Sequence, residues 1–99
     1  MRLTEHERCV ISEQAYRFFG AGTRVLLFGS RIDDNARGGD IDLYVETNKR
    51  LANRAAAASR FAAELQLELG EQKIDVIVRD SATPVQAIHE KAQATGVPL

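Results

Sequence analysis

The chain contains few of the residue types that mark specialised protein classes, with one cysteine, two prolines and no tryptophan among its 99 residues. Because the single Cys9 cannot form an intrachain disulfide, a disulfide-stapled secreted scaffold is excluded. The longest uninterrupted apolar runs are four residues long, whereas a membrane-spanning helix needs about 20 residues. The sequence therefore predicts a protein with no transmembrane helix and no membrane partner.

Neither sign of charge dominates the chain. Lysine and arginine number 13 and aspartate and glutamate 14, which gives a net charge of −1, and aromatic residues make up only 6%. A dedicated nucleic-acid binder would show a basic face with aromatic side chains among the basic ones, because neutralising phosphates supplies most non-specific affinity. The composition therefore disfavours nucleic acid as a partner.

The first residues also bear on localisation. Glu5 and Glu7 follow Leu3 at the point where a secretory signal would become apolar. The absence of a targeting pattern and the unpaired cysteine together favour a cytoplasmic protein. The apolar share of 44% and the charged share of 27% are those of an ordinary globular domain, so residues 1–99 are expected to form one domain around one core.

Sequence patterns predict the first half of the fold as a helix, a strand, a loop and a second strand. Thr4 and Glu7 have the spacing of a capping box, which begins a helix that Gly20 and Gly22 end. Residues 25–28 are apolar on both faces and are expected to form a central strand. Residues 29–39 are polar and form the loop, and residues 41–45 alternate apolar and polar side chains, as a strand with one buried face does.

The second half is predicted to contain a helix, a third strand and a last helix. Apolar residues recur at intervals of three and four from Leu51 to Leu69, ahead of Gly70. Residues 73–78 form the third strand, and Thr83 with Pro84 begins the last helix, which Gly96 and Pro98 close. The order α-β-β-α-β-α predicts an α/β or α+β fold, a small mixed sheet of three or more strands packed with helices.

Three aspartates occupy strand positions that this residue type normally avoids. Asp40 and Asp42 are two residues apart, which places them on one face of the second strand, about 6.6 Å apart along it. Asp75 lies in the third strand, whose sequence resembles that of the second, and the two strands are expected to be neighbours. Two carboxylates 5 Å apart repel by about 3 kcal/mol at an effective dielectric constant of 20. A divalent cation would remove this cost, and oxygen ligands beside phosphate favour Mg²⁺ or Mn²⁺.

Gly29 and Ser30 directly follow the apolar strand and suit the binding of a phosphate. Glycine allows close approach of the backbone, and serine offers a hydroxyl and an amide at a possible helix start. A phosphate site beside a metal site predicts a nucleoside triphosphate as the ligand.

These segments together carry a specific resemblance. Leu27-Phe28-Gly29-Ser30-Arg31, the loop to Gly39, and Asp40-Ile41-Asp42-Leu43 resemble the signature of the DNA polymerase beta-like nucleotidyltransferase superfamily, and above all its minimal single-domain members. Lys73-Ile74-Asp75-Val76 resembles the segment with that superfamily's third acidic residue. The resemblance covers nearly the whole chain and implies a nucleotidyltransferase fold.

The resemblance also implies roles for individual residues. Gly29 and Ser30 would hold the triphosphate, Asp40 and Asp42 would bind metal ions, and Asp75 would complete the catalytic and metal site beside the acceptor. The implied reaction transfers a nucleoside monophosphate, as AMP from ATP, to a hydroxyl group. The likeness to minimal nucleotidyltransferase antitoxins implies a protein acceptor, a HEPN-type RNase toxin that adenylylation would silence.

Two alternatives stay open at this stage. After Arg31 the sequence continues with Ile32-Asp33-Asp34, where many minimal members have a small residue, a basic residue and glycine. Arg31 and Arg37 are therefore candidates for phosphate contact and equally for a solvated loop. The first alternative is a non-catalytic antitoxin that blocks its partner by contact and keeps a vestigial nucleotide site. The second is an oligomeric nucleotidyltransferase that acts on a small molecule.

Two other residues are assigned structural roles. Cys9 is expected to be a small buried apolar residue, because no sequence pattern supplies an activating partner. Tyr44 shares the face of the strand aspartates and is expected to serve packing more than chemistry.

Overall fold

The computed structural model describes residues 3–28, 41–70, 73–83 and 87–99. Its first helix is capped at both ends. The helices and strands are α1 (Glu5–Phe19), β1 (Arg24–Phe28), β2 (Ile41–Glu46), α2 (Arg54–Leu69), β3 (Ile74–Arg79), α3 (Ala87–Thr95) and β4 (Val97–Pro98). The Thr4 hydroxyl accepts a hydrogen bond from the Glu7 amide, and the Glu7 carboxylate accepts one from the Thr4 amide, both at 3.0 Å. Gly20 ends α1 with a φ of 91°, a conformation that favours glycine. The predicted capping box is thus confirmed.

Helix α2 begins later than the apolar pattern predicted. Asn53 is its N-cap, and the Asn53 side chain accepts a hydrogen bond from the Ala56 amide at 3.0 Å. Leu51 lies before the helix, where it packs against the core and its amide donates to the Asp80 carboxylate at 2.8 Å. An apolar residue in helical register can therefore belong to the loop that leads into a helix, and the cap decides where the helix starts.

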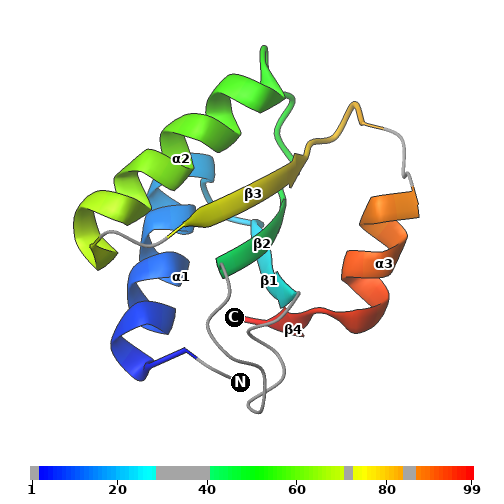
Figure 1. The fold of residues 1–99 in the computed structure, drawn as a ribbon. Coiled ribbons are helices and arrows are strands. Elements are labelled where there is room, and N and C mark those ends of the chain that lie inside the picture. The colour runs from blue at the N-terminus through cyan, green and yellow to red at the C-terminus, as the bar shows by residue number, and fades with distance from the viewer. Residues whose placement is uncertain (1–2, 29–40, 71–72, 84–86) are drawn as a thin grey trace.

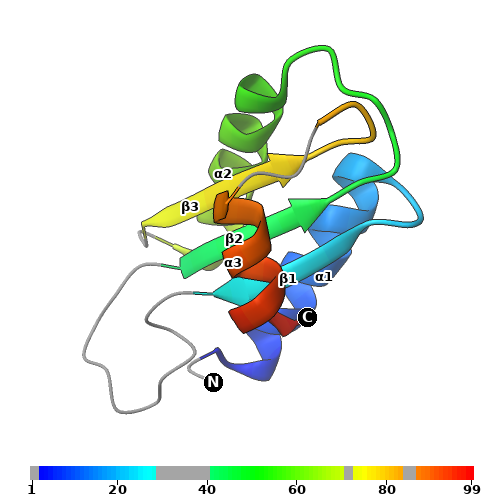
Figure 2. The same ribbon diagram turned by 90° about the vertical axis from the view of Figure 1, so that its right-hand side faces the viewer.

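The four strands form one mixed sheet in the order β3-β2-β1-β4. β1 pairs antiparallel with β2 and with β4, while β2 and β3 are parallel and joined through α2. The predictions that β1 is internal and that β2 and β3 are neighbours are both confirmed. Figures 1 and 2 show α1 and α2 on one face of the sheet and α3 on the other.

The last strand is a correction to the sequence prediction. Gly96 does end α3, through an amide that donates to the Ala92 carbonyl at 2.7 Å. Beyond it, Val97 pairs with Leu27 and Pro98 with Leu26, and the Leu99 amide donates to the Val25 carbonyl at 2.9 Å. The predicted helix stop is therefore also the start of a two-residue edge strand, a position where proline's missing N–H is tolerated.

Each face of the sheet has its own apolar cluster. The cluster under α1 and α2 contains Ile11, Ala15, Phe19, Val25, Leu27, Ile41, Leu43, Val45, Ala57, Phe61, Leu65, Ile74 and Val78. The cluster under α3 is smaller and consists of Leu26, Tyr44 and Ala92, with Phe28 and Ile77 packed against it. Because side chains alternate along a strand, the residues of β2 at 42, 44 and 46 all face the α3 side.

The architecture confirms the predicted mixed α/β class, a mixed sheet packed with helices. The assignment to the nucleotidyltransferase fold stays a prediction. Within the described residues no helix has both the length and the apolar character that a bilayer crossing requires.

Candidate functional site

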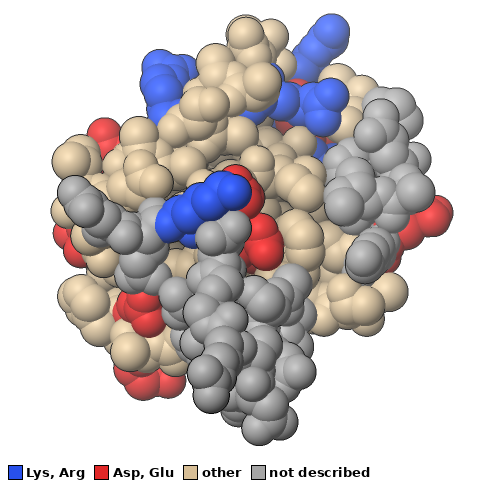
Figure 3. All heavy atoms as spheres, in the orientation of Figure 1, with Lys and Arg blue, Asp and Glu red and all other residues tan. Residues whose placement is uncertain are grey.

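Asp42 and Asp75 lie side by side at the start of two neighbouring parallel strands. Each is the second residue of its strand, and the β2–β3 register places them directly opposite each other. Neighbouring strands are about 4.8 Å apart, so both carboxylates can reach one ion. Asp75 is exposed and Asp42 partly buried, and Figure 3 shows acidic and basic side chains together at the surface over this end of the two strands. The structure thus brings together two of the predicted site residues.

The apolar residues on the other face of β2 and β3 hold the two aspartates in this position. Ile41 and Leu43, on either side of Asp42, are fully buried under α1 and α2, and Ile74 before Asp75 is buried as well. A shift of one residue in either strand would bury an aspartate and expose these side chains. The hydrophobic pattern therefore overrides the low strand propensity of aspartate.

The end of β1 lies at the same place in the sheet. Phe28, the last residue of β1, is paired with Asp42 and packs against the α3-side cluster. In the sequence Gly29 follows Phe28 directly and Asp40 precedes Ile41 directly. Both predicted segments are therefore joined by peptide bonds to strand residues that flank Asp42.

The remaining predicted site residues cannot be placed in this arrangement. Gly29, Ser30, Arg31, Arg37 and Asp40 lie outside the described residues. Within the ranges that the structure describes, no group of three or more histidine, cysteine, aspartate or glutamate side chains is close enough together to hold a metal ion. Asp42 and Asp75 are thus the described part of the predicted metal site.

The chemistry of these two side chains fits a hard divalent cation. Both are carboxylates, and carboxylate oxygen is the ligand that Mg²⁺ and Mn²⁺ favour over softer nitrogen or sulfur donors. Two like charges on adjacent strand positions also disfavour each other, and a cation between them removes that cost. Two protein carboxylates leave coordination positions for water and phosphate oxygens, as Mg²⁺ sites beside nucleotides commonly do.

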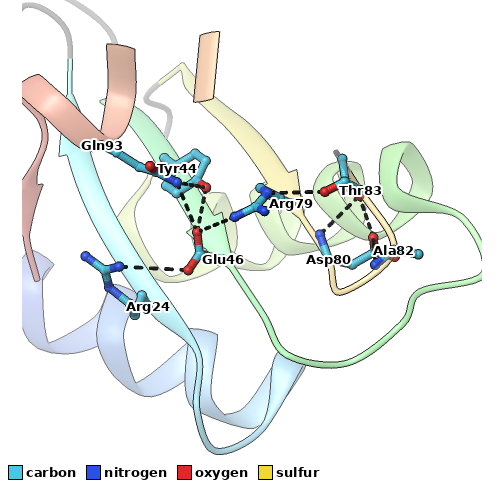
Figure 4. Close-up of polar contacts among 8 residues, drawn as sticks. All are labelled: Arg24, Tyr44, Glu46, Arg79, Asp80, Ala82, Thr83 and Gln93. Carbon is cyan, nitrogen blue, oxygen red and sulfur yellow. Dashed lines mark hydrogen bonds and ion pairs between the residues drawn. The ribbon is translucent and has the colours of Figure 1, made fainter. Parts of the chain in front are cut away.

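A second polar cluster, which sequence reasoning missed, lies on the same face at the opposite end of β2. The Tyr44 hydroxyl donates to the Glu46 carboxylate at 2.8 Å, and the Gln93 amide of α3 donates to the Tyr44 oxygen at 3.0 Å (Figure 4). Arg79 donates to the same Glu46 oxygen at 3.0 Å, and Arg24 lies 3.8 Å from its other oxygen. Three strands and α3 therefore meet at Glu46.

The pKa shifts in this cluster follow from these contacts. The Tyr44 hydroxyl, and after it the Arg79 guanidinium, holds the pKa of Glu46 below its usual value. Burial raises the pKa of Tyr44, whose side chain is 1% exposed. Both groups keep their ordinary charge at neutral pH and are engaged in internal hydrogen bonds, so the cluster attaches α3 to the sheet. The expectation that Tyr44 serves packing is confirmed.

The sequence does contain a signal for this cluster. The similar segments Ile41–Val45 and Ile74–Val78 each continue by one charged residue, Glu46 and Arg79. Once the two strands are placed in parallel register, these opposite charges pair. Extending the comparison of the two strands by one residue would have predicted the ion pair.

Asp80 closes the turn after β3. Its carboxylate accepts hydrogen bonds from the Leu51 amide at 2.8 Å, the Ala82 amide at 3.1 Å and the Thr83 hydroxyl. These donors, Thr83 first and Leu51 next, hold the pKa of Asp80 below its usual value. A carboxylate whose pKa is lower in the folded than in the unfolded chain stabilises the fold. This stabilisation is complete at pH values above the unfolded pKa of about 3.9. It is lost as the pH falls through the pKa of the folded state.

We therefore expect Asp80→Asn to be less stable than the wild type at pH 7, with a difference that shrinks as the pH falls from about 5 to 2. Urea midpoints measured at several pH values check this. Glu68→Gln, which removes an exposed carboxylate from α2, should keep the wild-type pH slope. A stability difference for Asp80→Asn that persists unchanged to pH 2 would contradict the assigned role.

The prediction for Cys9 is wrong, because Cys9 is exposed. It lies on the outward side of α1, whose buried residues are Ile11, Ala15 and Phe19. The number of apolar residues in a helix does not by itself indicate which of its small residues face solvent.

Comparison of the chain with protein-family models, with curated proteins and with solved structures found no match.

Proposed function

We propose that this protein is a Mg²⁺-dependent nucleotidyltransferase that moves a nucleoside monophosphate, AMP from ATP, to a hydroxyl group of a partner protein. The observation that carries the proposal is the pairing of Asp42 and Asp75 in register on adjacent parallel strands. Gly29-Ser30, which resembles the family's phosphate-binding segment, follows β1 directly in the sequence, and β1 ends opposite Asp42. The proposal therefore combines the sequence motif with one arrangement of the described residues.

The transfer reaction is a single exchange of bonds at phosphorus. The acceptor oxygen forms a bond to the α-phosphorus, the bond from that phosphorus to the oxygen bridging to the β-phosphate breaks, and pyrophosphate and the hydroxyl proton leave. Little covalent chemistry is required of the protein, so positioning and charge neutralisation supply most of the rate. Carboxylates at fixed strand positions suit that task because their backbone does not reorganise.

Asp42 and Asp75 would hold the divalent ion, together with Asp40, to which the resemblance gives the same role. When bound, the ion neutralises charge on the triphosphate and on the leaving pyrophosphate. Asp75, the more exposed of the two described carboxylates, would accept a hydrogen bond from an incoming hydroxyl. Its main contribution is to position that hydroxyl, because a carboxylate bound to a cation is a weak base.

The acceptor comes from outside the described elements. The described residues form three helices, and all three pack on the faces of the sheet. None of them forms a separate acceptor-binding unit. A protein that presents a hydroxyl-bearing side chain is the simplest acceptor, and the resemblance to minimal antitoxins points to a HEPN-type toxin.

The test is label transfer. The protein is incubated with Mg²⁺ and ATP labelled at the α-phosphate, together with the product of the adjacent gene, and protein-bound label is measured. We expect label on the neighbouring gene product, and none when ATP is labelled at the γ-phosphate. Silencing of the neighbour without any label would instead support the non-catalytic antitoxin.

A further inference from the structure

The two edges of the sheet differ in how well they are protected. Edge strands offer unpaired backbone groups to other chains, and short length, proline or charge usually blunts them. β4 has two residues and contains Pro98. β3 has six residues, no proline, and pairs only with β2 among the described strands. Of the two sheet edges formed by the described residues, the β3 edge is therefore the longer one, with charged residues at 75 and 79 but no proline.

Alternate residues of β3 direct their backbone groups to this edge. The Ile41 amide donates to the Lys73 carbonyl and the Thr47 amide to the Arg79 carbonyl, both at 3.0 Å. In a parallel ladder the backbone N–H and C=O groups of the odd-numbered residues of β3 therefore point toward β2. The backbone groups of Ile74, Val76 and Val78 point outward. Arg54 of α2 confirms this direction, since its guanidinium reaches the Val78 carbonyl from outside the ladder at 3.3 Å.

A shallow apolar groove runs along the same edge. It has a volume of about 300 Å³ and is lined by Arg54, Ala55, Ala58, Val76, Ile77 and Val78. The alanines of α2 leave room above the strand for side chains of medium size. A strand added at this edge would place alternate side chains into the groove, which is the geometry of strand addition.

The sequence of β3 is complementary to itself in one antiparallel register. When two copies of β3 pair antiparallel, a two-fold axis relates them. The outward-facing backbone groups of one copy must pair with the outward-facing groups of the other, which allows the axis to pass through residue 75, 76, 77 or 78. An axis at 75 sets Asp75 against itself, an axis at 76 sets Lys73 against Arg79, and an axis at 78 sets Val76 against Asp80. With the axis at Ile77, each Asp75 faces Arg79 of the second copy, and Val76 faces Val78. Opposite charges and apolar side chains then match over residues 75–79 of β3.

We infer that β3 is a homodimer interface, in which a second copy of this chain adds its β3 antiparallel with the two-fold axis at Ile77 and forms a continuous eight-stranded sheet. Val76 and Val78, which line the groove of each copy, then lie beside Val78 and Val76 of the other. The Val78 carbonyl has two lone pairs. It can therefore accept a hydrogen bond from the Val76 amide of the second copy and keep the one from the Arg54 guanidinium. Closed two-fold pairing also removes the open edge from further association.

Cysteine cross-linking tests the register. At a non-hydrogen-bonded antiparallel pair the Cα atoms are about 4.5 Å apart, within the range that a disulfide spans. In a Cys9→Ser background, which removes the exposed thiol, Ile77→Cys should form a disulfide-linked dimer under mild oxidation. Val76→Cys should form it at least about 10-fold more slowly, because the axis at Ile77 separates the two sulfurs beyond disulfide reach.

Sedimentation equilibrium tests the association without cysteines. The wild type should show a concentration-dependent dimer, and Asp75→Lys, which sets a lysine against Arg79, should raise the dimer Kd at least about tenfold. Glu13→Lys makes the same charge change on an exposed residue of α1 and should leave the Kd unchanged. A wild type that stays monomeric throughout, equal cross-linking at residues 76 and 77, or equal Kd values for the two lysine variants would overturn the inference.

Discussion

Asp75→Asn is expected to lose nearly all nucleotide transfer while each subunit keeps its fold. The substitution keeps the shape of the side chain and removes the charge beside Asp42. Groups that act on charge developing in a transition state typically contribute about 100- to 1,000-fold to the rate, and we expect a loss of that size. Since Asp75 is exposed and lies next to another carboxylate, losing its charge relieves repulsion and costs the fold little.

Asp42→Asn should reduce transfer by a similar factor, because both carboxylates would hold the same ion. The two substitutions together should cost little more than either alone, as is usual for residues that act as a unit. Initial rates of label transfer and melting temperatures, measured on the same preparations, check both statements. Glu64→Gln on α2 supplies the control for loss of an exposed carboxylate outside the site.

Transfer that survives in both single variants would show that Asp42 and Asp75 are not the site. A loss of transfer accompanied by a large fall in melting temperature would assign them a structural role instead. The stability measurement is therefore as informative as the rate.

The sequence predicted most of the fold because its local signals agree with its tertiary pattern. The capping box at Thr4, the glycine stops and the alternation in β2 each have a short-range physical cause. That β2 and β3 are neighbours was predicted from the likeness of their sequences, and the structure adds that they are parallel. Their register then brought Asp42 and Asp75 together as predicted.

The parts that escaped prediction depend on distant contacts. β4 exists because Val97 and Pro98 pair with β1, some 70 residues earlier in the chain, and two residues carry no strand periodicity of their own. Leu51 leaves the helix because its amide bonds to Asp80, 29 residues away in sequence. The Glu46 network likewise draws on β1, β2, β3 and α3. Such contacts follow from the assembled fold and not from a local pattern.

Phe61→Ala is the substitution expected to cost the fold most. Phe61 is fully buried on the inner face of α2, and its ring lies 5.2 Å from Phe19 in an edge-to-face contact and 5.8 Å from Phe18. Removing a buried phenylalanine loses its transfer free energy and leaves a cavity, at about 3–5 kcal/mol. Domains of this size have a total stability of about 5–15 kcal/mol, so the variant should be close to unfolding at 37 °C.

The same helix supplies the matched control, because Leu67 is 81% exposed. Leu67→Ala removes a large apolar side chain that makes little contact with the core, and alanine is a strong helix former. Its free energy of unfolding, measured by urea titration, should stay within about 0.5 kcal/mol of the wild type. Similar losses for the two variants would mean that α2 does not pack on the sheet through Phe61, and the β2–α2–β3 unit that holds Asp42 beside Asp75 would then lack its main anchor.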